Sequence, residues 1–242
     1  MVQIDTVYGD IDWDAEVTDN DASLVLSHIT GDELLSPLQQ ATGDASNSAS
    51  LSAFDASLIL QFISGNLEGI PIENSDSFIA NGNLHSPEIL GEVGEIVTIP
   101  ISIENSNNLY SFSISFTYNN VQLESGSVYL GPISEYGFLV ESSVSDSGSI
   151  IVTGASPTSI GGDLDLFTMY FIPTEFENGQ LEIECNQIML NEVMQQQSFS
   201  ILINNQLQIG NEVTPNRFNL ENNFPNPFNN NTLISFYGEI NS

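Results

Sequence analysis

A strictly alternating stretch lies near the middle of the chain: Leu109-Tyr110-Ser111-Phe112-Ser113-Ile114-Ser115-Phe116-Thr117-Tyr118. Successive side chains of a β-strand point to opposite faces of the sheet, so apolar residues at every second position give the strand one buried face. Serine and threonine occupy the positions between them. The stretch therefore predicts a strand that covers an apolar core with one of its faces.

Shorter stretches of the same kind surround this strand. They lie at residues 96–103, 128–130, 138–140, 149–153, 166–171, 181–185 and 199–203. Turn-forming pairs fall between several of them, namely Asn119-Asn120, Gly161-Gly162, Asn178-Gly179 and Asn204-Asn205. Many short strands at this spacing, without a helical period, indicate an all-β sandwich or jelly roll. We assign it to residues 88–210.

The order of these features is similar to that of a cohesin, over about residues 84–210. An opening strand reads Gly94-Glu95-Ile96-Val97-Thr98-Ile99-Pro100-Ile101, and the strand at 109–118 follows it. Later come Ile151-Val152-Thr153-Gly154-Ala155-Ser156 and Ile160-Gly161-Gly162-Asp163-Leu164, before a strand that ends in Phe171. The resemblance implies a nine-stranded jelly roll. Carbohydrate-binding modules share that fold. Sugar binding would need a row of exposed aromatic residues, for which Tyr110, Tyr118, Tyr129 and Tyr136 are candidates. Tyr110 and Tyr118 share the parity of Phe112 and Phe116, so the core is the alternative place for them.

The N-terminal region contains an internal repeat in which Asp44 follows Asp10 by 34 residues. In each copy, side chains with oxygen atoms occupy positions 1, 3, 5, 9 and 12 of a loop, the spacing of an EF-hand calcium loop. Position 7 of such a loop donates a backbone carbonyl. The predicted calcium ligands are Asp10, Asp12, Asp14, Glu16, Thr18 and Asp21 in loop 1 (Asp10–Asp21), and Asp44, Ser46, Ser48, Ser50, Ser52 and Asp55 in loop 2 (Asp44–Asp55).

Each loop leads into an apolar helical stripe that ends at Gly31 or Gly65. The doubled unit resembles the type I dockerin, over about residues 7–67, which implies two bound calcium ions. Loop 2 has serine at Ser46 and Ser48 where loop 1 has acids, so we expect it to bind calcium more weakly. Position 6, usually glycine, is Ala15 or Ala49, and a left-handed alanine costs roughly 1–2 kcal/mol.

The dockerin resemblance also implies a protein partner. Dockerins contact cohesins through four positions of each unit, which here are Asp19, Asn20, Ser27 and His28, and Ala53, Phe54, Gln61 and Phe62. Phe54 and Phe62 make the second unit the better apolar anchor. The partner would be the cohesin domain of another copy or of a different protein, and the sequence leaves both open.

The C-terminal stretch from Arg217-Phe218 to Ser235-Phe236 resembles the start of a type IX secretion sorting domain, over about residues 213–242. This resemblance implies a protein secreted to the cell surface or beyond. We therefore divide the chain into a calcium-binding module at 1–69, a linker at 70–87, the sandwich at 88–210 and an incomplete sorting segment at 211–242.

The charge balance excludes several classes of partner. The chain has 32 acids and one base, Arg217, for a formal net charge of −31. Nucleic acid and anionic membranes need a basic patch, and a P-loop needs a lysine. The acids must therefore be hydrated or paired with cations from the medium, which favours a saline, calcium-containing surrounding. No stretch is apolar over the roughly 20 residues that a membrane span needs.

No arrangement of residues indicates catalysis. His28 and His85 lack a partner pattern, and Cys185 alternates with strand residues as a buried thiol would. We therefore predict a non-catalytic, secreted scaffold whose dockerin docks onto a cohesin, that of the next copy or of another protein, and so builds head-to-tail extracellular filaments or cell-surface complexes. The alternative is a carbohydrate-binding module that its dockerin tethers to a larger enzyme complex.

Overall fold

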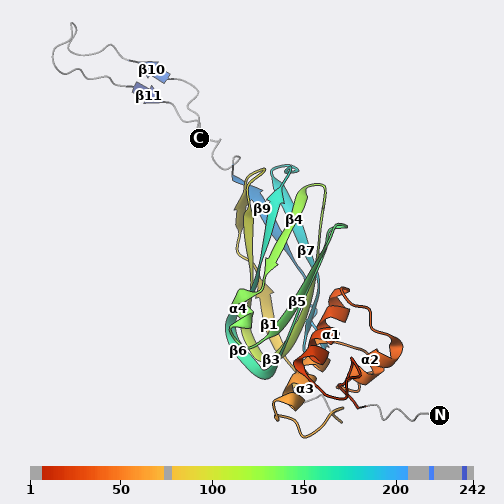
Figure 1. Ribbon diagram of the computed structural model, residues 1–242. Coiled ribbons are helices and arrows are strands. Elements are labelled where there is room, and N and C mark those ends of the chain that lie inside the picture. Colours follow the sequence, from red (N-terminus) through yellow and green to blue (C-terminus); the bar gives the residue numbers. More distant parts are fainter. Residues whose placement is uncertain (1–6, 74–77, 207–217, 221–235, 239–242) are drawn as a thin grey trace, which may run out of the picture. The chain divides into compact units, whose positions relative to one another are not determined.

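The structure, a computed structural model, describes residues 7–73, 78–206, 218–220 and 236–238 (Figure 1). It divides into two units, residues 1–204 and 205–242. In the second unit, β10 (Phe218–Leu220) pairs antiparallel with β11 (Phe236–Gly238). The rest of the predicted sorting segment, Arg217 included, lies outside the described residues, and that prediction stays open.

The first unit contains a β-sandwich, which confirms that part of the predicted fold class. Its strands are β1 (Asn81–His85), β2 (Ile89–Gly91), β3 (Val97–Tyr118), β4 (Leu123–Tyr129), β5 (Leu139–Ser145), β6 (Ser149–Pro173), β7 (Gln180–Leu190), β8 (Val193–Met194) and β9 (Phe199–Asn205). They form one hydrogen-bonded sheet with the order β2-β9-β7-β3-β6-β4, in which β1 also pairs with β3, β5 with β6, and β8 with β7.

Two long strands build both layers of the sandwich. The first half of β3 pairs with β1 and with the second half of β6, whereas its second half pairs with β7 and with the first half of β6. Register shifts between Ile101 and Ser111 separate the halves, and Asn105 and Asn108 have positive φ there. Bulges of this kind bend a strand, which lets one strand run from layer to layer.

The continuity of these strands differs from the sequence prediction. The segments at 96–103 and 109–118 were expected as separate strands, as were 149–153 and 166–171, with a turn at Gly161-Gly162. The polar residues between them read as turn signals, but they form bulges inside β3 and β6 instead. A bulge and a turn use the same residue types, so composition alone does not distinguish them.

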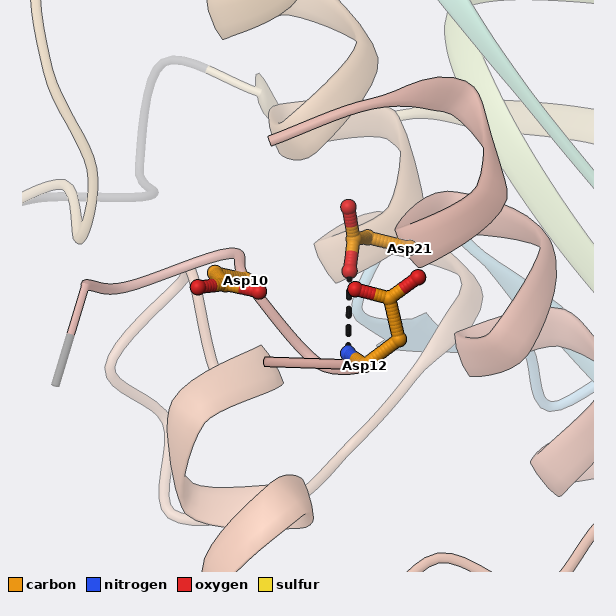
Figure 2. Close-up of side chains that lie close together, drawn as sticks. All are labelled: Asp10, Asp12 and Asp21. Atoms are coloured by element: carbon orange, nitrogen blue, oxygen red, sulfur yellow. Dashed lines mark hydrogen bonds between the residues drawn. The ribbon is translucent and has the colours of Figure 1, made fainter. Parts of the chain in front are cut away.

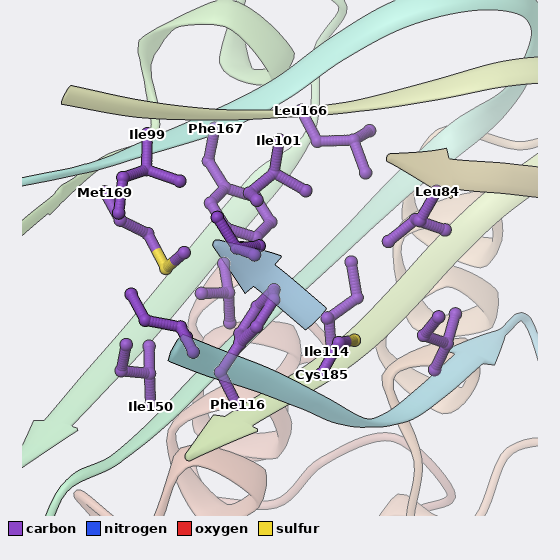
Figure 3. Close-up of a cluster of buried hydrophobic side chains, with 14 of the residues drawn as sticks. Leu84, Ile99, Ile101, Ile114, Phe116, Ile150, Leu166, Phe167, Met169 and Cys185 are labelled. Carbon is purple, nitrogen blue, oxygen red and sulfur yellow. The ribbon is translucent and has the colours of Figure 1, made fainter. Parts of the chain in front are cut away.

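The core lies between the layers, where the predicted apolar faces meet (Figure 3). Phe112, Ile114 and Phe116 are fully buried there, opposite the residues of the other half-strand such as Ile99 and Ile101. Cys185 is also buried in this core, as the sequence predicted. The serines that alternate with the phenylalanines in β3 therefore point to the outer face of the sheet.

Residues 7–73 form a helical module with α1 (Asp19–Thr30), α2 (Pro37–Gly43) and α3 (Ala53–Ile63). Thr18 and Ser52 cap α1 and α3, and each makes a capping box with the aspartate at loop position 12, Asp21 or Asp55. Gly31, with φ of 88°, ends α1, as predicted. The helix α2 was not predicted. A short helix, α4 (Gly131–Ser134), belongs to the sandwich.

The region 70–87, predicted as a linker, packs on both neighbouring parts of the chain. Ile70 and Ile72 pack on the buried helical core, and the backbone amide of Ile72 donates to the Ala45 carbonyl at 2.9 Å. The sandwich already begins at β1, where Leu84 is buried. The apolar residues dispersed among the polar ones of this stretch fix it at both ends. Among the described residues, no helix has the length and apolarity of a membrane span.

Candidate functional site

The two predicted calcium loops have the same backbone conformation. Positions 4 and 6 have positive φ in both, at Trp13 (62°) and Ala15 (73°) in loop 1 and at Asn47 (60°) and Ala49 (67°) in loop 2. The predicted left-handed alanines are therefore present. The strain of about 1–2 kcal/mol at each is tolerated twice, at equivalent positions. The repeat seen in the sequence is thus a repeat in three dimensions.

The hydrogen bonds within the loops repeat as well. The position-1 aspartate accepts from the amides of positions 5 and 6, at 3.1 Å and 3.1 Å on Asp10 and at 3.0 Å and 2.9 Å on Asp44. The position-12 aspartate accepts from the amide of position 9, at 2.8 Å on Asp21 and 2.7 Å on Asp55. These bonds hold the carboxylates at positions 1 and 12 against the inside of each loop.

Loop 1 gathers three carboxylates. Oxygens of Asp10, Asp12 and Asp21 all lie within 4.8 Å of one another (Figure 2). Asp14, the fourth predicted acidic ligand, lies outside this group, and its Oδ1 accepts from the Glu16 amide at 2.8 Å. A set of oxygen donors without nitrogen or sulfur suits a hard cation such as calcium. The residues present therefore fit that ion, with Asp10, Asp12 and Asp21 as its closest holders.

Loop 2 has fewer acids. Asp55 is fully buried, and this burial raises the pKa of its carboxyl to about 6, although hydrogen bonds from Ser46 and Ser52 lower it. Since the pKa is higher in the folded state, folding favours the protonated acid, and the stability from this group is lost as the pH rises through about 6. A cation beside the charged carboxylate would offset that cost. Two other predicted ligand groups of loop 2 are bonded to each other, because the Ser48 hydroxyl donates to the Ser50 carbonyl at 3.0 Å.

The helical module packs on the sandwich within this chain. α3 contacts β6 and β3, and α1 contacts β5 and β6 (Figure 1). We call the outer face of β3, β5 and β6 that these helices cover the docking face. Ser111 and Ala155, which pair across β3 and β6, lie fully buried on it. The serine face of the alternating strand is thus partly covered by helices rather than by solvent.

Aromatic and polar contacts join the two parts. Phe54 of α3 packs on Phe78, and Phe78 packs edge-on against Tyr110 of β3, with ring centroids 5.2 Å and 5.4 Å apart. The Ser57 hydroxyl donates to the Ser156 carbonyl at 2.8 Å, in a buried position. At the margins of the interface the hydrogen bonds are Ser23 to Glu141 (3.2 Å), Asn66 to the Pro157 carbonyl (3.0 Å) and Ser46 to Glu192.

The predicted partner positions of the second unit need a correction. Ala53, Phe54 and Gln61 are buried inside this chain, so their surfaces are not open to a separate molecule in this arrangement. Phe62 is half-buried. The physical reason is that the apolar anchor predicted for a partner packs on the chain's own Phe78 and docking face. The sequence therefore identified residues that do lie in an interface, but it assigned that interface to a separate molecule instead of to this chain.

The four positions of the first unit lie differently. Asp19 and Asn20 are exposed, while Ser27 and His28 are half-buried. The His28 Nδ1 atom accepts from the Leu35 amide at 3.2 Å, which ties the end of α1 to the following turn. Asn20 donates to Asp12 at 2.8 Å and so supports loop 1. Two of these four residues thus have contacts within the module itself.

Several interface residues were not found from the sequence, among them Ser23, Ser57, Glu141, Ser156, Asn191 and Glu192. One sequence feature could have indicated this interface. Small residues repeat along the outer faces of the strands predicted at 109–118 and 149–153, and small side chains leave room for a helix. Of the four tyrosines considered for sugar binding, Tyr118 is buried in the sandwich core, as its parity with Phe116 indicated, and Tyr110 packs against Phe78, while Tyr129 and Tyr136 are half-exposed.

Comparison with known proteins supports the sandwich assignment. Residues 83–175 match the family model of the cohesin domain. Cohesin domains are non-catalytic protein-interaction modules that bind dockerins. No curated protein matches the chain. The dockerin and sorting-domain resemblances therefore remain predictions.

The solved structures that are similar to part of this chain include the following three. One is a cohesin module of a family 33 glycoside hydrolase from Clostridium perfringens, 18% identical, with 53% of this chain and 100% of that chain covered and a TM-score of 0.43. A non-cellulosomal cohesin from Archaeoglobus fulgidus is 21% identical, with coverage of 53% and 93% and a TM-score of 0.42. A type I cohesin–dockerin complex from Clostridium thermocellum is 14% identical, with coverage of 52% and 99% and a TM-score of 0.44.

Proposed function

We propose that this chain is a non-catalytic docking protein in which the sandwich is the receptor and the helical module is its ligand. The cohesin match over residues 83–175 supports the receptor role. The observation that carries the proposal is the packing of α1 and α3 on the docking face, with Ser57 bonded to Ser156 at its buried centre. The pairing joins the two parts of one chain and covers its own docking face.

We further propose that the two loops each hold one calcium ion. The shared loop conformation and the three carboxylates of loop 1 support this assignment. The ion would supply positive charge in a chain that has 32 acids and one base. Bound calcium would stabilise the helical module by about 2.7 kcal/mol at a hundred times its dissociation constant.

The same pairing offers a route to assembly between copies. Because the docking face is covered within the chain, a second copy can join only when one helical module leaves its own sandwich and occupies the next. Head-to-tail exchange of this kind gives closed rings or open filaments. Assembly would then be slow, concentration-dependent and suppressed by whatever holds the module on its own sandwich. We place this assembly outside the cell, where cohesin domains of cell-surface complexes occur.

One substitution on α3 tests the pairing in the full-length chain. Ser57→Arg places a long charged side chain where the Ser57 hydroxyl is fully buried against β6. We expect the wild-type unit to unfold in one calorimetric transition and the variant in two, with a larger hydrodynamic radius for the variant. Calcium binding, measured by titration calorimetry, should persist because Ser57 lies outside both loops. Leu34→Arg, at a residue that is 83% exposed, is the matched control.

The outcomes separate the parts of the proposal. A Ser57→Arg variant with one transition and an unchanged radius would refute the docking of the module on its sandwich. Sedimentation over a range of concentrations tests the exchange, because multimers should grow in the wild type and be absent in Ser57→Arg. Multimers of equal abundance in both proteins would show that copies associate through another surface.

A further inference from the structure

Loop 2 has fewer acids than loop 1. Positions 3 and 5, which are Asp12 and Asp14 in loop 1, are Ser46 and Ser48 in loop 2. The remaining carboxylates of loop 2 are Asp44 and Asp55. Both occupy the ends of the loop, so the oxygens of its middle belong to uncharged groups, namely hydroxyls, the Asn47 amide and the backbone. To have as much negative charge near a bound cation as loop 1 has, loop 2 needs a carboxylate from another part of the chain.

The turn between β7 and β8 approaches loop 2 from the sandwich. Glu192 lies in this turn, half-buried, and its carboxylate accepts a hydrogen bond from the Ser46 hydroxyl. The same hydroxyl lies 3.4 Å from Asp44 Oδ1. The sandwich thus places a carboxylate beside Ser46, the residue of loop 2 that corresponds to Asp12 of loop 1. Glu192 is separated from Ser46 by 146 residues, so no local sequence pattern reveals this contact.

The turn that carries Glu192 is firmly held. Its neighbour Asn191 is 1% exposed, and its side-chain carbonyl accepts from the amides of Tyr110 (2.9 Å) and Ser111 (3.0 Å). The Asn191 side-chain amide donates to the carbonyls of Phe78 and Asn108. Phe78 packs in turn on Phe54 of α3. The position of Glu192 is therefore fixed to the docking interface rather than to a free loop.

The chemistry of the contact favours a role in cation binding. A serine hydroxyl has one hydrogen and two lone pairs, so a hydroxyl that donates to Glu192 keeps its lone pairs for a cation. An outer carboxylate that accepts from a ligand also orients it and makes it a stronger donor. Among the described residues, the oxygens that gather within 4.8 Å as a group of three acids belong to loop 1. Glu192 would thus act through Ser46 rather than as a third direct ligand.

From these contacts we infer that Glu192 is a positioning residue of loop 2, through which cation binding and docking of the helical module stabilise each other. The inference rests on the proposed calcium function of the loops. When the module leaves the sandwich, Ser46 loses its acceptor and loop 2 loses the nearby charge, so its calcium affinity falls. By thermodynamic reciprocity, calcium in loop 2 strengthens the docking by the same factor.

Titration calorimetry of the full-length protein with calcium chloride tests this coupling. We expect Glu192→Gln, which keeps the size but removes the charge, to weaken loop 2 by about tenfold, as loss of an outer carboxylate typically does. Loop 1 should keep its affinity. Asp10→Asn and Asp44→Asn assign the two binding steps to their loops. The matched control is Glu141→Gln, which removes the other interfacial carboxylate, because Glu141 accepts from Ser23 of α1 and not from a residue of loop 2.

A second readout is the rise in unfolding temperature on adding calcium, which should be smaller in Glu192→Gln than in Glu141→Gln. Equal loop 2 affinity in the wild type and Glu192→Gln would overturn the inference. Equal weakening by Glu141→Gln would overturn it too, because any interfacial charge would then suffice. A wild-type protein that binds no calcium would instead refute the proposed function of the loops, whatever the variants do.

Discussion

Ala15 and Ala49 hold left-handed conformations that alanine disfavours. Their φ angles are 73° and 67°, and both side chains are exposed, so no packing interaction depends on the methyl group. The strain of about 1–2 kcal/mol exceeds the entropic cost of a glycine, which is roughly 0.5–1 kcal/mol. We therefore expect Ala15→Gly and Ala49→Gly each to raise the free energy of unfolding by about 0.5–1 kcal/mol.

Chemical denaturation in the presence of calcium measures this gain. Ala41→Gly, at an exposed position of α2, should by contrast lower the free energy of unfolding by about 1 kcal/mol, as glycine does within helices. If the loop variants lose stability as the helical control does, the positive φ of the loops is not a source of strain.

Cys185 gives a probe of the sandwich core that needs no engineering. Burial raises the pKa of its thiol to about 12, so at pH 8 the nucleophilic thiolate is nearly absent in the folded protein. We expect Ellman's reagent to react with Cys185 only at the rate of unfolding, and rapidly once denaturant is added. Fast stoichiometric labelling of the native protein would place the thiol outside the core.

At the scale of elements, the β7–β8 turn connects more parts of the molecule than its length suggests. Asn191 has a φ of 52° and bonds to β3 and to the Phe78 segment. Asn191→Gly keeps that backbone conformation but removes the side chain, and we expect a loss of about 2 kcal/mol or more because buried polar groups lose their partner. Thermal unfolding compares it with Asn178→Gly, which has a φ of 51° but is exposed and should be near neutral.

A stability loss of the same size in both asparagine variants would mean that the buried hydrogen bonds of Asn191 add nothing to the general cost of replacing an asparagine by glycine at a positive φ.

The sequence alone predicts those elements that depend on interactions between residues close together in the chain. The alternation of Phe112, Ile114 and Phe116 is a local pattern, and the strand that it predicts agrees with the structure. The loop repeat is also local, and equivalent positions of both loops have positive φ, but calcium binding by these loops stays a prediction. The continuity of β3 and β6 depends on bulges whose partners are far apart in the chain, so the pattern divided them. The sequence assigned Phe54 to a separate partner molecule and gave Ser57 no role. The reason is that the pattern of a helix face does not identify the surface on which the helix packs.

At the scale of the molecule, the shortage of basic residues limits the kinds of contact that can hold the helical module on the sandwich. Glu141 and Glu192 meet serine hydroxyls across the docking face, and no arginine or lysine of the described residues pairs with them. Ion pairs therefore do not hold the helical module, and its attachment relies on apolar packing, hydrogen bonds and the proposed cations. Salt should affect this attachment mainly by screening repulsion among the acids.

The central claim is that the helical module occupies the docking face of its own chain. Its most direct test is crosslinking of Ser23→Cys/Glu141→Cys, two side chains that touch across the interface, by a short bis-maleimide in calcium, with each single variant as control and Cys185 shielded by burial. We predict a crosslinked monomer whose yield is independent of protein concentration and falls when a chelator is added. Attachment of separate reagent molecules at the two cysteines, without a link between them, would contradict the claim.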